Sequence, residues 1–325
     1  MTNTTQELHV VFGTGPMGAA IMHELVQRGK RVRMINRRGK PSLATGAPHG
    51  VEFQAGDLYQ PGNATVVSKG ATHIYQAAQP EYHEWTEKFP PIQNAVLEAA
   101  IAHQARLIVV ENLYMYGDVN GQPITETLPY RPSAPVKGTL RQRLTEQLID
   151  AHLKGRVRVV MGRGADFYGP GDMVQGEQTF IPALKGKTAN GVGNIDLPHS
   201  FTYTKDFGKA LVILGEHDQA FGQAWHVPTN PPLTQRELIT MIYQAAGTEP
   251  KMRGASTLMM RALGLFVPAV KEMVEMMYEF NKPFILDSSK FTTQFGMTAT
   301  PHQDAVRETV AWFRANLPAI EAQAH

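Results

Sequence analysis

Short runs of apolar residues alternate with amphipathic stretches over the first half of the chain. The runs are rich in Val, Ile, Leu and Phe, which is typical of strands buried on both faces of a sheet. After the first run, Met17, Ile21 and Leu25 recur every fourth residue, and this spacing places them on one face of a helix. We expect six strands, in segments 8–12, 31–36, 51–58, 71–78, 106–112 and 156–163.

Further helical patterns separate the later strands. One covers residues 92–105, and another is marked by Leu140, Leu144 and Leu148. Strands that alternate with helices form parallel sheets covered on both faces, and right-handed crossovers make such a sheet doubly wound. The pattern therefore predicts an α/β fold with a doubly wound parallel sheet, which binds ligands at the carboxyl ends of its strands.

The pattern changes after Tyr168. A Gly- and Pro-rich region follows, then a helix and a short strand within 204–228 that we expect to return to the sheet. The final part opens a helix with a capping box at Thr234 and Glu237, and Thr300 and Pro301 open another in a similar way.

These patterns predict two domains. The sheet domain comprises residues 1–167 together with 204–228. Residues 168–203 and 229–325 form a smaller, mainly helical domain.

The composition is that of an ordinary globular protein. Of 325 residues, 42% are hydrophobic and 18% are charged, and the net charge of +2 gives no reason to expect nucleic acid or an anionic membrane as partner. The absence of cysteine excludes disulfides, thiolate metal sites and cysteine nucleophiles. The amino-terminal residues lack the pattern of a signal peptide, and the apolar stretch Leu258–Val270 is too short to span a membrane. We expect a cytoplasmic protein that acts on a small molecule.

A glycine-rich turn follows the first predicted strand. Gly13, Gly15 and Gly18 form a G-x-G-x-x-G pattern, and Pro16 and Met17 begin the helix behind it. Such glycines permit a tight turn, close approach of a pyrophosphate, and close packing of helix on strand. The helix amino terminus adds free N–H groups for the phosphates. We predict a dinucleotide site here; the alternative is a purely structural turn.

The end of the second strand indicates which dinucleotide binds. Dinucleotide sites for NAD usually place Asp or Glu there, against the ribose 2′-hydroxyl. This chain has Asn36, Arg37 and Arg38 instead. Two guanidinium groups can pair with a 2′-phosphate, so we predict NADP as the cofactor. The alternative is an exposed basic turn.

Other predicted cofactor contacts follow successive strands, in the order that a dinucleotide fold requires. The small side chains after the fourth strand leave room for the cofactor, and polar groups follow the third, fifth and sixth strands. The complete set beyond the glycine turn and the basic turn is Asp57, Leu58, Ala77, Ala78, Gln79, Asn112, Lys137, Gly164, Ala165 and Asp166.

Several motifs resemble those of one protein family. The glycine turn, "VENLYMYG" at 110–117, "GRGADFYGPGD" at 162–172 and "FTYTKDFGKAL" at 201–211 are similar to segments of the extended short-chain dehydrogenase/reductase superfamily, of the NAD-dependent epimerase/dehydratase type. The resemblance extends to the carboxyl-terminal helix. It implies a Rossmann-like NADP-binding domain at 1–167 and a smaller substrate domain at 168–203 and 229–325.

The chain departs from that family at the catalytic positions. The resemblance implies a Ser or Thr, a Tyr that transfers the proton, and a Lys that lowers the pKa of the Tyr. Those positions fall on Asn112, Gly138 and Gln142. The Tyr-x-x-x-Lys spacing occurs only from Tyr278 to Lys282, where the following proline disfavours a helix. We therefore expect a member of the atypical branch, without the standard triad.

Other residues are candidates to replace the triad. The Tyr114 hydroxyl could donate a proton to a substrate oxygen, whereas Tyr116 is expected to pack. Lys137 could reach the cofactor ribose or a substrate oxyanion, or it is a solvated lysine of the first helical turn. Asn112 could hydrogen-bond a carbonyl or the nicotinamide, and Arg141 could share the face of Lys137.

The later segments supply weaker candidates. Asp166 is a possible base, with capping of a turn as the alternative, and His199 and Tyr203 could line the substrate side. The 12 histidines show no metal-ligand spacing such as H-E-x-x-H, so we expect no metal. The methionine-rich stretch Met252–Phe280 is interpreted as a substrate lid, a homodimer surface or, most simply, helix core.

Three functions fit these observations. The first is an NADP-dependent oxidoreductase that transfers hydride to or from a small carbonyl or alcohol compound. In this enzyme Tyr114 or Lys137 would neutralise the charge that develops on the substrate oxygen. The second is a non-catalytic NADP-binding sensor or scaffold. The third is a nucleotide-sugar epimerase, which we rank lower because transient oxidation usually relies on the Tyr–Lys pair that is missing here.

Overall fold

A computed structural model describes residues 7–255, 257–264 and 273–323 of the chain. The chain divides into two compact units, each made of three segments. Unit 1 comprises Met1–Asn112, Thr139–Arg163 and Lys205–Val227. Unit 2 comprises Leu113–Gly138, Gly164–Thr204 and Pro228–His325.

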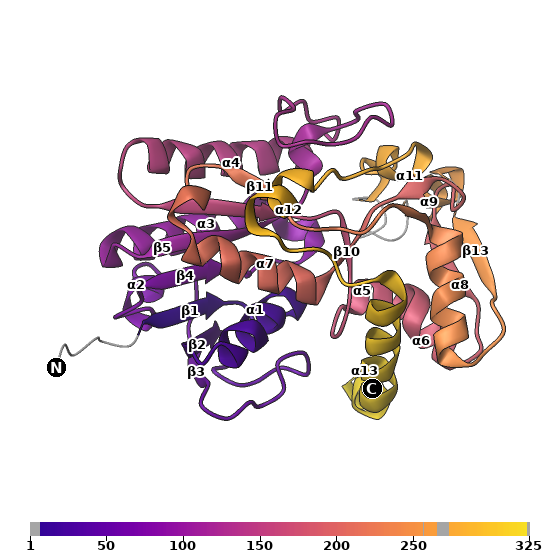
Figure 1. Cartoon of the computed structure of the whole chain (residues 1–325), viewed down its shortest axis with the longest axis horizontal. Coiled ribbons are helices and arrows are strands. Elements are labelled where there is room, and N and C mark those ends of the chain that lie inside the picture. The colour runs from indigo at the N-terminus through magenta and orange to yellow at the C-terminus, as the bar shows by residue number, and fades with distance from the viewer. Residues whose placement is uncertain (1–6, 256, 265–272, 324–325) are drawn as a thin grey trace. The chain divides into compact units, whose positions relative to one another are not determined.

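A seven-stranded sheet forms the centre of unit 1, in the order β11-β6-β5-β4-β1-β2-β3 (Figure 1). Every neighbouring pair in it is parallel. The predicted doubly wound, Rossmann-like fold is therefore confirmed. Its strands are β1 (Leu8–Phe12), β2 (Arg31–Asn36), β3 (Glu52–Ala55), β4 (His73–Gln76), β5 (Arg106–Glu111), β6 (Val159–Arg163) and β11 (Ala224–His226).

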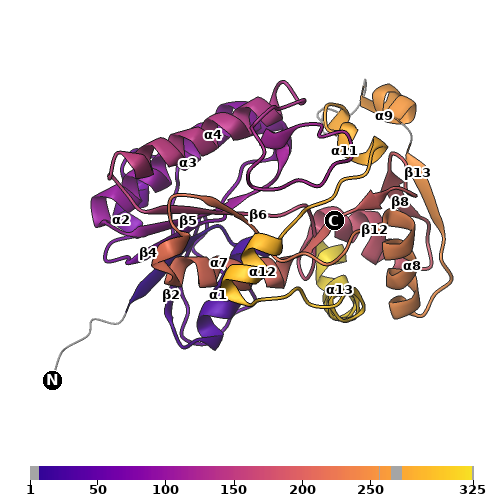
Figure 2. The same ribbon diagram turned by 45° about the horizontal axis from the view of Figure 1, so that its top comes forward.

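Helices cover both faces of this sheet (Figure 2). Alternate strand residues such as Val10, Phe12 and Ile74 join a core with α2, α3 and α4. On the other face, α7 packs closely on α1, since a Cβ at Gly208 would lie 2.5 Å from the backbone of Ala20. The helices are α1 (Pro16–Gln27), α2 (Asn63–Val67), α3 (Trp85–His103), α4 (Lys137–Leu153) and α7 (Thr204–Glu216), with 3-10 turns at Tyr82–Glu84 and Asp218–Ala220.

Helix α3 differs from its prediction. It begins at Trp85, seven residues before the predicted start, and contains Pro90 and Pro91. Neither proline has an N–H group to donate to the carbonyl four residues earlier, so α3 forms despite the loss of two helical hydrogen bonds. Trp85 and Phe89 pack edge to face, with ring centroids 5.3 Å apart, and this contact holds the first turn.

Unit 2 combines short strand pairs with helices. The pairs are β7 (Asp166–Tyr168) with β10 (Phe201–Tyr203), β9 (Pro198–His199) with β12 (Leu233–Thr234), and β8 (Ala189–Val192) with β13 (Met252–Ala255). The helical segments are the 3-10 turn η2 (Tyr114–Tyr116), α5 (Met173–Gln175), the π-helical turn η3 (Gly176–Phe180), α6 (Ile181–Leu184), α8 (Gln235–Ala246), α9 (Thr257–Gly264), α11 (Tyr278–Asn281), α12 (Ser289–Phe295) and α13 (His302–Gln323).

The core of unit 2 is built mainly from α8 and α13. Ile242 of α8 and Phe313 of α13 are fully buried in it, and Phe313 stacks on Phe180. The capping box predicted at the start of α8 is confirmed, with Thr234 and Glu237 each bonding the other's backbone. Helix α13 begins at His302, one residue later than the predicted first position at Pro301.

The two units and the predicted domains differ over residues 113–138. We predicted that this segment belongs to the sheet domain, but it groups with unit 2. The reason is a small core in which Leu113, Met115 and Ile124 pack with Phe284 and Leu286. Among the described residues, no helix is both long and apolar enough to cross a membrane.

Candidate functional site

The glycine turn has the shape that a dinucleotide requires. Gly13 has a positive φ of +107°, and a Cβ there would lie 2.7 Å from the backbone nitrogen of Ala78. A Cβ at Gly18 would lie 2.0 Å from the carbonyl oxygen of Gly13. Gly15, in contrast, is exposed and has nothing within 4 Å of where its Cβ would be. Two glycines thus close the turn, and the third leaves its surface open to a ligand.

The amino terminus of α1 faces this opening with free backbone donors. Gly15 is the N-cap residue in an extended conformation, Pro16 occupies the first turn, and no side chain bonds the cap. The N–H groups of a helix's first turn have no partner within the helix, and phosphates bind there. The residues present therefore fit the pyrophosphate of a dinucleotide.

The turn after β2 is held by Asn36. Its side-chain nitrogen donates to Thr14 Oγ1 at 2.9 Å and to the carbonyl of Lys40 at 2.7 Å. Its side-chain oxygen accepts from the backbone of Arg38 at 3.0 Å. Arg37 and Arg38 are both exposed. Asn36 thus fixes the turn, and the two arginines offer their charge beside the glycine turn.

The other residues of unit 1 that we predicted to contact the cofactor lie in different surroundings. Ala77 and Ala78 adjoin the turn at Gly13. Asp57 instead accepts a hydrogen bond from the backbone of Tyr59 at 3.0 Å, so its carboxylate caps a turn. Leu58 packs against the core of the sheet, and Gln79 is exposed.

A buried ion pair joins the ends of β5 and β6, next to Asn112. Glu111 and Arg163 are register partners and both are almost fully buried. The Glu111 carboxylate accepts from Arg163 Nε at 2.8 Å and from Thr145 Oγ1 at 2.6 Å. Arg141 lies 3.4 Å from the same carboxylate and over the ring of Phe89.

We expected that Arg141 could share the face of Lys137, and its side chain is 3% exposed beside the Glu111 carboxylate. We did not predict the Glu111–Arg163 pair. The available signal was a charged residue at the carboxyl end of each of two neighbouring strands, Glu111 in β5 and Arg163 in β6.

Tyr114 and Lys137 both belong to unit 2. Tyr114 begins η2 and is half-buried, and Tyr116 packs on Tyr130, as expected for it. Lys137 is 1% exposed. The alternative of a solvated lysine is therefore wrong. The carboxylate of Glu275 accepts from the backbone N–H groups of residues 136 and 137 and thereby caps α4.

Gly138, to which we assign the family's catalytic Tyr, has no room for a side chain. A Cβ there would lie 2.8 Å from the Cβ of Pro132 and 3.0 Å from the carbonyl oxygen of Tyr114. Gln142, assigned to the family's Lys, donates to Glu146 one turn along the same helix. Neither of these two positions carries a hydroxyl or an ammonium group in this chain.

The segment after β6 positions Asp166. The backbone of Ala165, which follows the buried Gly164, donates to Thr202 Oγ1 at 3.0 Å. The Asp166 carboxylate lies 2.9 Å from Nε2 of His199. His199 is buried and stacks on Phe280. Asp166 is therefore held by a histidine, whereas our alternative for it was a turn cap.

The negative charge of Asp166 also affects the pKa values of two buried carboxyl groups, those of Asp172 and Glu279. Burial raises the pKa of Asp172 to about 6, and the charge of Asp166 adds to the effect. Burial, followed by the charge of Asp166, raises the pKa of Glu279 well above its usual value.

Tyr203, which we predicted on the substrate side, donates to Glu308 of α13 at 2.5 Å.

Comparison with known proteins agrees with this arrangement. The model of the NAD dependent epimerase/dehydratase family matches residues 10–227, about two thirds of the chain. The chain belongs to this family. The match includes the glycine turn, the turn after β2 and the segment around Asp166. No curated protein matches the chain in sequence.

Solved structures of other proteins share the fold over nearly the whole chain. UDP-glucose 4-epimerase of Thermus thermophilus, in complex with NAD, has a TM-score of 0.76 and 19% identity, covering 94% of this chain and 99% of its own. DesIV of Streptomyces venezuelae, a dTDP-glucose 4,6-dehydratase with NAD and TYD bound, has a TM-score of 0.77 and 18% identity, covering 96% and 98%. Epimerase Mth375 of Methanothermobacter thermautotrophicus has a TM-score of 0.77 and 14% identity, covering 98% and 95%.

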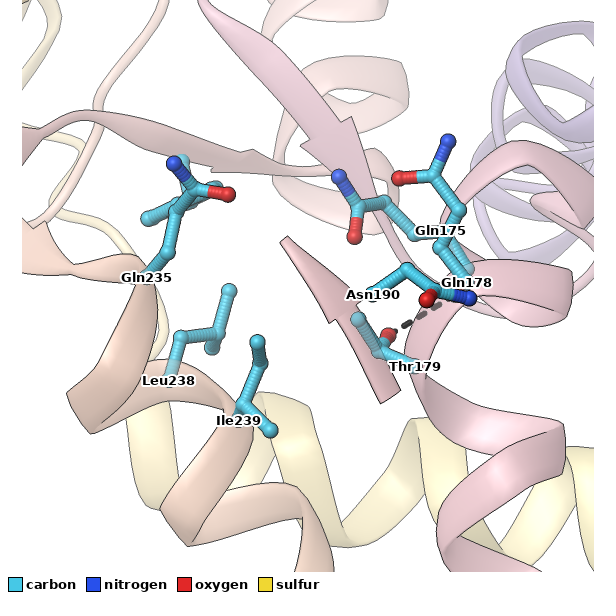
Figure 3. Close-up of a pocket in the computed structure, with 8 residues that line it drawn as sticks. Gln175, Gln178, Thr179, Asn190, Gln235, Leu238 and Ile239 are labelled. Carbon is cyan, nitrogen blue, oxygen red and sulfur yellow. Dashed lines mark hydrogen bonds between the residues drawn. The ribbon is translucent and has the colours of Figure 1, made fainter. Parts of the chain in front are cut away.

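Unit 2 of this family member also contains a small hollow lined by carboxamides (Figure 3). Its volume of about 10 Å³ accommodates about one water molecule. Gln235 is already bonded to both backbone groups of Val192. The hollow is therefore too small to be a substrate site. Its lining residues are Gln175, Gln178, Thr179, Asn190, Phe201, Gln235, Leu238 and Ile239.

The structure also shows the surroundings of the Tyr278–Lys282 spacing and of part of the methionine-rich stretch. Tyr278 lies in the short helix α11, but Lys282 is extended and bonds Asp118 at 2.5 Å, so the spacing from Tyr278 to Lys282 is not a helical pair. In the methionine-rich stretch, Met260 and Met277 are buried in a small core, whereas Met259 is exposed. Residues 256 and 265–272 of that stretch lie outside the described residues.

Proposed function

We propose that the chain is an NADP-dependent oxidoreductase that acts on a small carbonyl or alcohol compound. The observation that carries the proposal is the pair of exposed guanidinium groups, Arg37 and Arg38, on the turn after β2. That turn is tied directly to the glycine turn through the bond between Asn36 and Thr14. A 2′-phosphate is a dianion that such groups bind through strong, charge-assisted hydrogen bonds. Residues 36–40 contain no carboxylate that would repel it.

The chain's own residues would control the proton and the charge on substrate oxygen. The cofactor would supply or accept the hydride. The Tyr114 hydroxyl is the candidate donor of a proton to that oxygen, and Lys137 is the candidate cation that stabilises negative charge on it. Because Lys137 is buried, its charge would act with little screening by water. A protein that binds NADP but turns nothing over would instead be a sensor or scaffold.

A nucleotide-sugar epimerase is the second candidate. It is supported by the coverage of the comparison structures, which extends across unit 2 as well as the sheet and includes proteins solved with NAD or with UDP-sugars. Against it stands the assignment of the Tyr and Lys positions to Gly138 and Gln142. This candidate predicts tight NAD binding and interconversion of UDP-sugars.

Substitution of Arg37 tests the cofactor assignment. Loss of a charge-assisted hydrogen bond costs about 1.5–3 kcal/mol, or roughly 10- to 100-fold in affinity. Arg37→Ala should weaken NADPH binding by that factor and leave NADH binding unchanged, as measured by isothermal titration calorimetry at fixed salt. The matched control is Arg31→Ala, which removes an exposed arginine from the opposite end of the same strand. Equal loss for both cofactors would contradict the assignment.

A turnover assay tests the reaction class. The purified protein is incubated with NADPH and a panel of aldehydes, ketones and enones, and the loss of reduced-cofactor absorbance is followed. Oxidation of NADPH that falls at least 10-fold in Tyr114→Phe supports the proposed oxidoreductase. Tight NADPH binding without turnover supports a sensor, and epimerisation of UDP-glucose supports the second candidate.

A further inference from the structure

Two histidines lie side by side at the amino ends of neighbouring strands. His9 of β1 and His73 of β4 are register partners in the parallel sheet, so their side chains leave the same face. Their rings stack, with centroids 4.3 Å apart and planes 11° apart. The glycine turn follows the carboxyl end of β1. The histidine pair therefore lies at the opposite edge of the sheet from the cofactor turn and has no part in the function proposed above.

Hydrogen bonds hold both rings, and the His73 ring also hydrogen-bonds the backbone of Gly215. His9 Nδ1 lies 3.3 Å from the hydroxyl of Tyr75, and His73 Nδ1 lies 3.0 Å from Oγ1 of Thr72. His9 is fully buried, yet its Nε2 has no hydrogen-bond partner among the described residues. Buried polar atoms almost always have a partner. An orphaned imidazole nitrogen, oriented by a bond at its other nitrogen, is the arrangement found in metal-ligating histidines.

Glu7 adds a carboxylate to the pair. Its Oε2 lies 3.8 Å from His9 Nε2, which is too far for a hydrogen bond. One ligand atom from each of Glu7, His9 and His73 lies within 4.8 Å of the others. Glu7 is exposed, so it can turn without disturbing the core.

We propose that Glu7, His9 and His73 bind a divalent transition-metal ion, with Zn²⁺ as the best fit. Two imidazole nitrogens and one carboxylate oxygen form a zinc ligand set that leaves a fourth position for water. Tetrahedral ligands at zinc distances are about 3.3 Å apart. Binding therefore requires Glu7 to turn inward and the two rings to rotate until their nitrogens converge. The ion would tie the start of β1 to the start of β4.

The charges around the cluster are compatible with a cation. Lys30 lies 3.1 Å from Glu7 and 3.6 Å from Glu216, so Glu216 can keep it paired when Glu7 turns to the metal. Arg106 is paired with Asp218 at 2.7 Å. The nearby positive charges therefore each have a carboxylate partner besides Glu7.

Sequence spacing cannot show this cluster, because the ligands come from strands far apart in the chain and meet through sheet register. Our expectation of no metal rested on sequence spacing such as H-E-x-x-H and covered the whole chain. The proposed site, at the amino ends of β1 and β4, departs from that expectation.

The experiment is a metal titration of the full chain after removal of metals with EDTA. Calorimetry with ZnCl₂ should give one equivalent of bound ion, and CoCl₂ should give the visible absorption of a tetrahedral Co²⁺ site. Zinc at 100 times its dissociation constant should raise the folding equilibrium constant about 100-fold. Glu7→Gln and His73→Gln should each weaken Zn²⁺ binding by at least 10-fold. His49→Gln, which changes an exposed histidine elsewhere, should have no effect.

Glu7→Gln keeps the test decisive if His73→Gln fails to fold, because Glu7 is exposed and carries little of the core. The absence of stoichiometric binding would overturn the proposal. So would binding that Glu7→Gln leaves unchanged, since that result would place the ion on other histidines. Neither result would bear on NADP binding, which is measured separately.

Discussion

Gly13, Gly15 and Gly18 perform different tasks within one turn. Gly13 and Gly18 lie against backbone atoms, so neither position has room for a Cβ. Gly15 lacks any neighbour within 4 Å of its would-be Cβ. Gly13 and Gly18 thus maintain the fold of the turn, and Gly15 leaves space for a ligand.

We therefore expect Gly18→Ala to reduce mainly the stability of the protein, and Gly15→Ala to reduce mainly its affinity for NADPH. Gly18→Ala places a Cβ 2.0 Å from a carbonyl oxygen and should destabilise the protein by about 3 kcal/mol. Gly15→Ala should cost less than about 1 kcal/mol, because alanine is only a poorer N-cap there, yet it should weaken NADPH binding at least 10-fold. Urea unfolding and cofactor titration separate the two quantities. A Gly15→Ala protein that binds NADPH as tightly as wild type would show that the ligand does not approach this residue.

At the scale of elements, the ends of β5 and β6 depend on the pair of Glu111 and Arg163. Both side chains are 0% exposed, so neither charge can be solvated if the other is removed. Removing one partner of such a pair typically costs about 3–5 kcal/mol. Glu111→Gln should therefore lower the free energy of unfolding by about 3 kcal/mol or more.

The control for that substitution is an exposed pair one turn apart in α4. Asp150→Asn breaks the contact with Lys154 and should change stability by less than about 0.5 kcal/mol. Both values come from urea unfolding followed by circular dichroism. Equal, small losses for the two variants would mean that Arg163 finds another partner when Glu111 is replaced.

The short helix α5 carries a pH-dependent cap. Asp172 accepts from the backbone of Gln175, while burial raises the pKa of the Asp172 carboxyl to about 6 from 3.8. The folded protein therefore binds a proton between about pH 6 and 4 more tightly than the unfolded chain does. The free energy of unfolding falls as the pH rises through this window, by on the order of 3 kcal/mol from this group.

Asp172→Asn should remove that loss and keep the cap, because Asn and Asp are equally good N-cap residues. The variant should match wild type at pH 4 and be more stable than wild type at pH 7. Urea unfolding at the two pH values measures the difference. A variant that is less stable at pH 7 would show that the ionised carboxylate has a stabilising role.

Most strands of unit 1 follow from the sequence, but several contacts do not. Apolar runs gave β1 and β2 with their ends, because strands buried on both faces have a simple pattern. The start of α3 at Trp85 was not predicted, since the helix continues through Pro90 and Pro91 and its first turn includes the packing of Trp85 on Phe89. Cross-strand partners such as His9 with His73 depend on strand order and register, which a linear pattern does not contain.

The candidate site was predictable in part for a similar reason. The glycine turn and the arginines after β2 are local in sequence, so their chemistry could be inferred directly. The burial of Lys137 and the bond between Asp166 and His199 depend on tertiary packing of unit 2. No sequence rule gives those contacts in advance.

At the scale of the whole molecule, each unit is assembled from three separate stretches of chain. Unit 1 needs β11 and α7 from Lys205–Val227, where Leu211 covers Gly162 and Gly208 packs on Ala20. A fragment of residues 1–167 lacks these elements and exposes the parts of the sheet and of α1 that α7 covers. It should lack a cooperative urea transition, measured by circular dichroism, whereas the full chain shows one. A cooperative transition in the fragment would mean that the first half folds without them.

The central claim is that this family member selects NADP through the basic turn after β2. The most direct measurement is the dissociation constant of the wild-type full chain for NADPH and for NADH, by calorimetry in one buffer at one salt concentration. We expect NADPH to bind at least 10-fold more tightly than NADH, through one or more charge-assisted bonds to the 2′-phosphate. Equal affinities, or tighter binding of NADH, would contradict it.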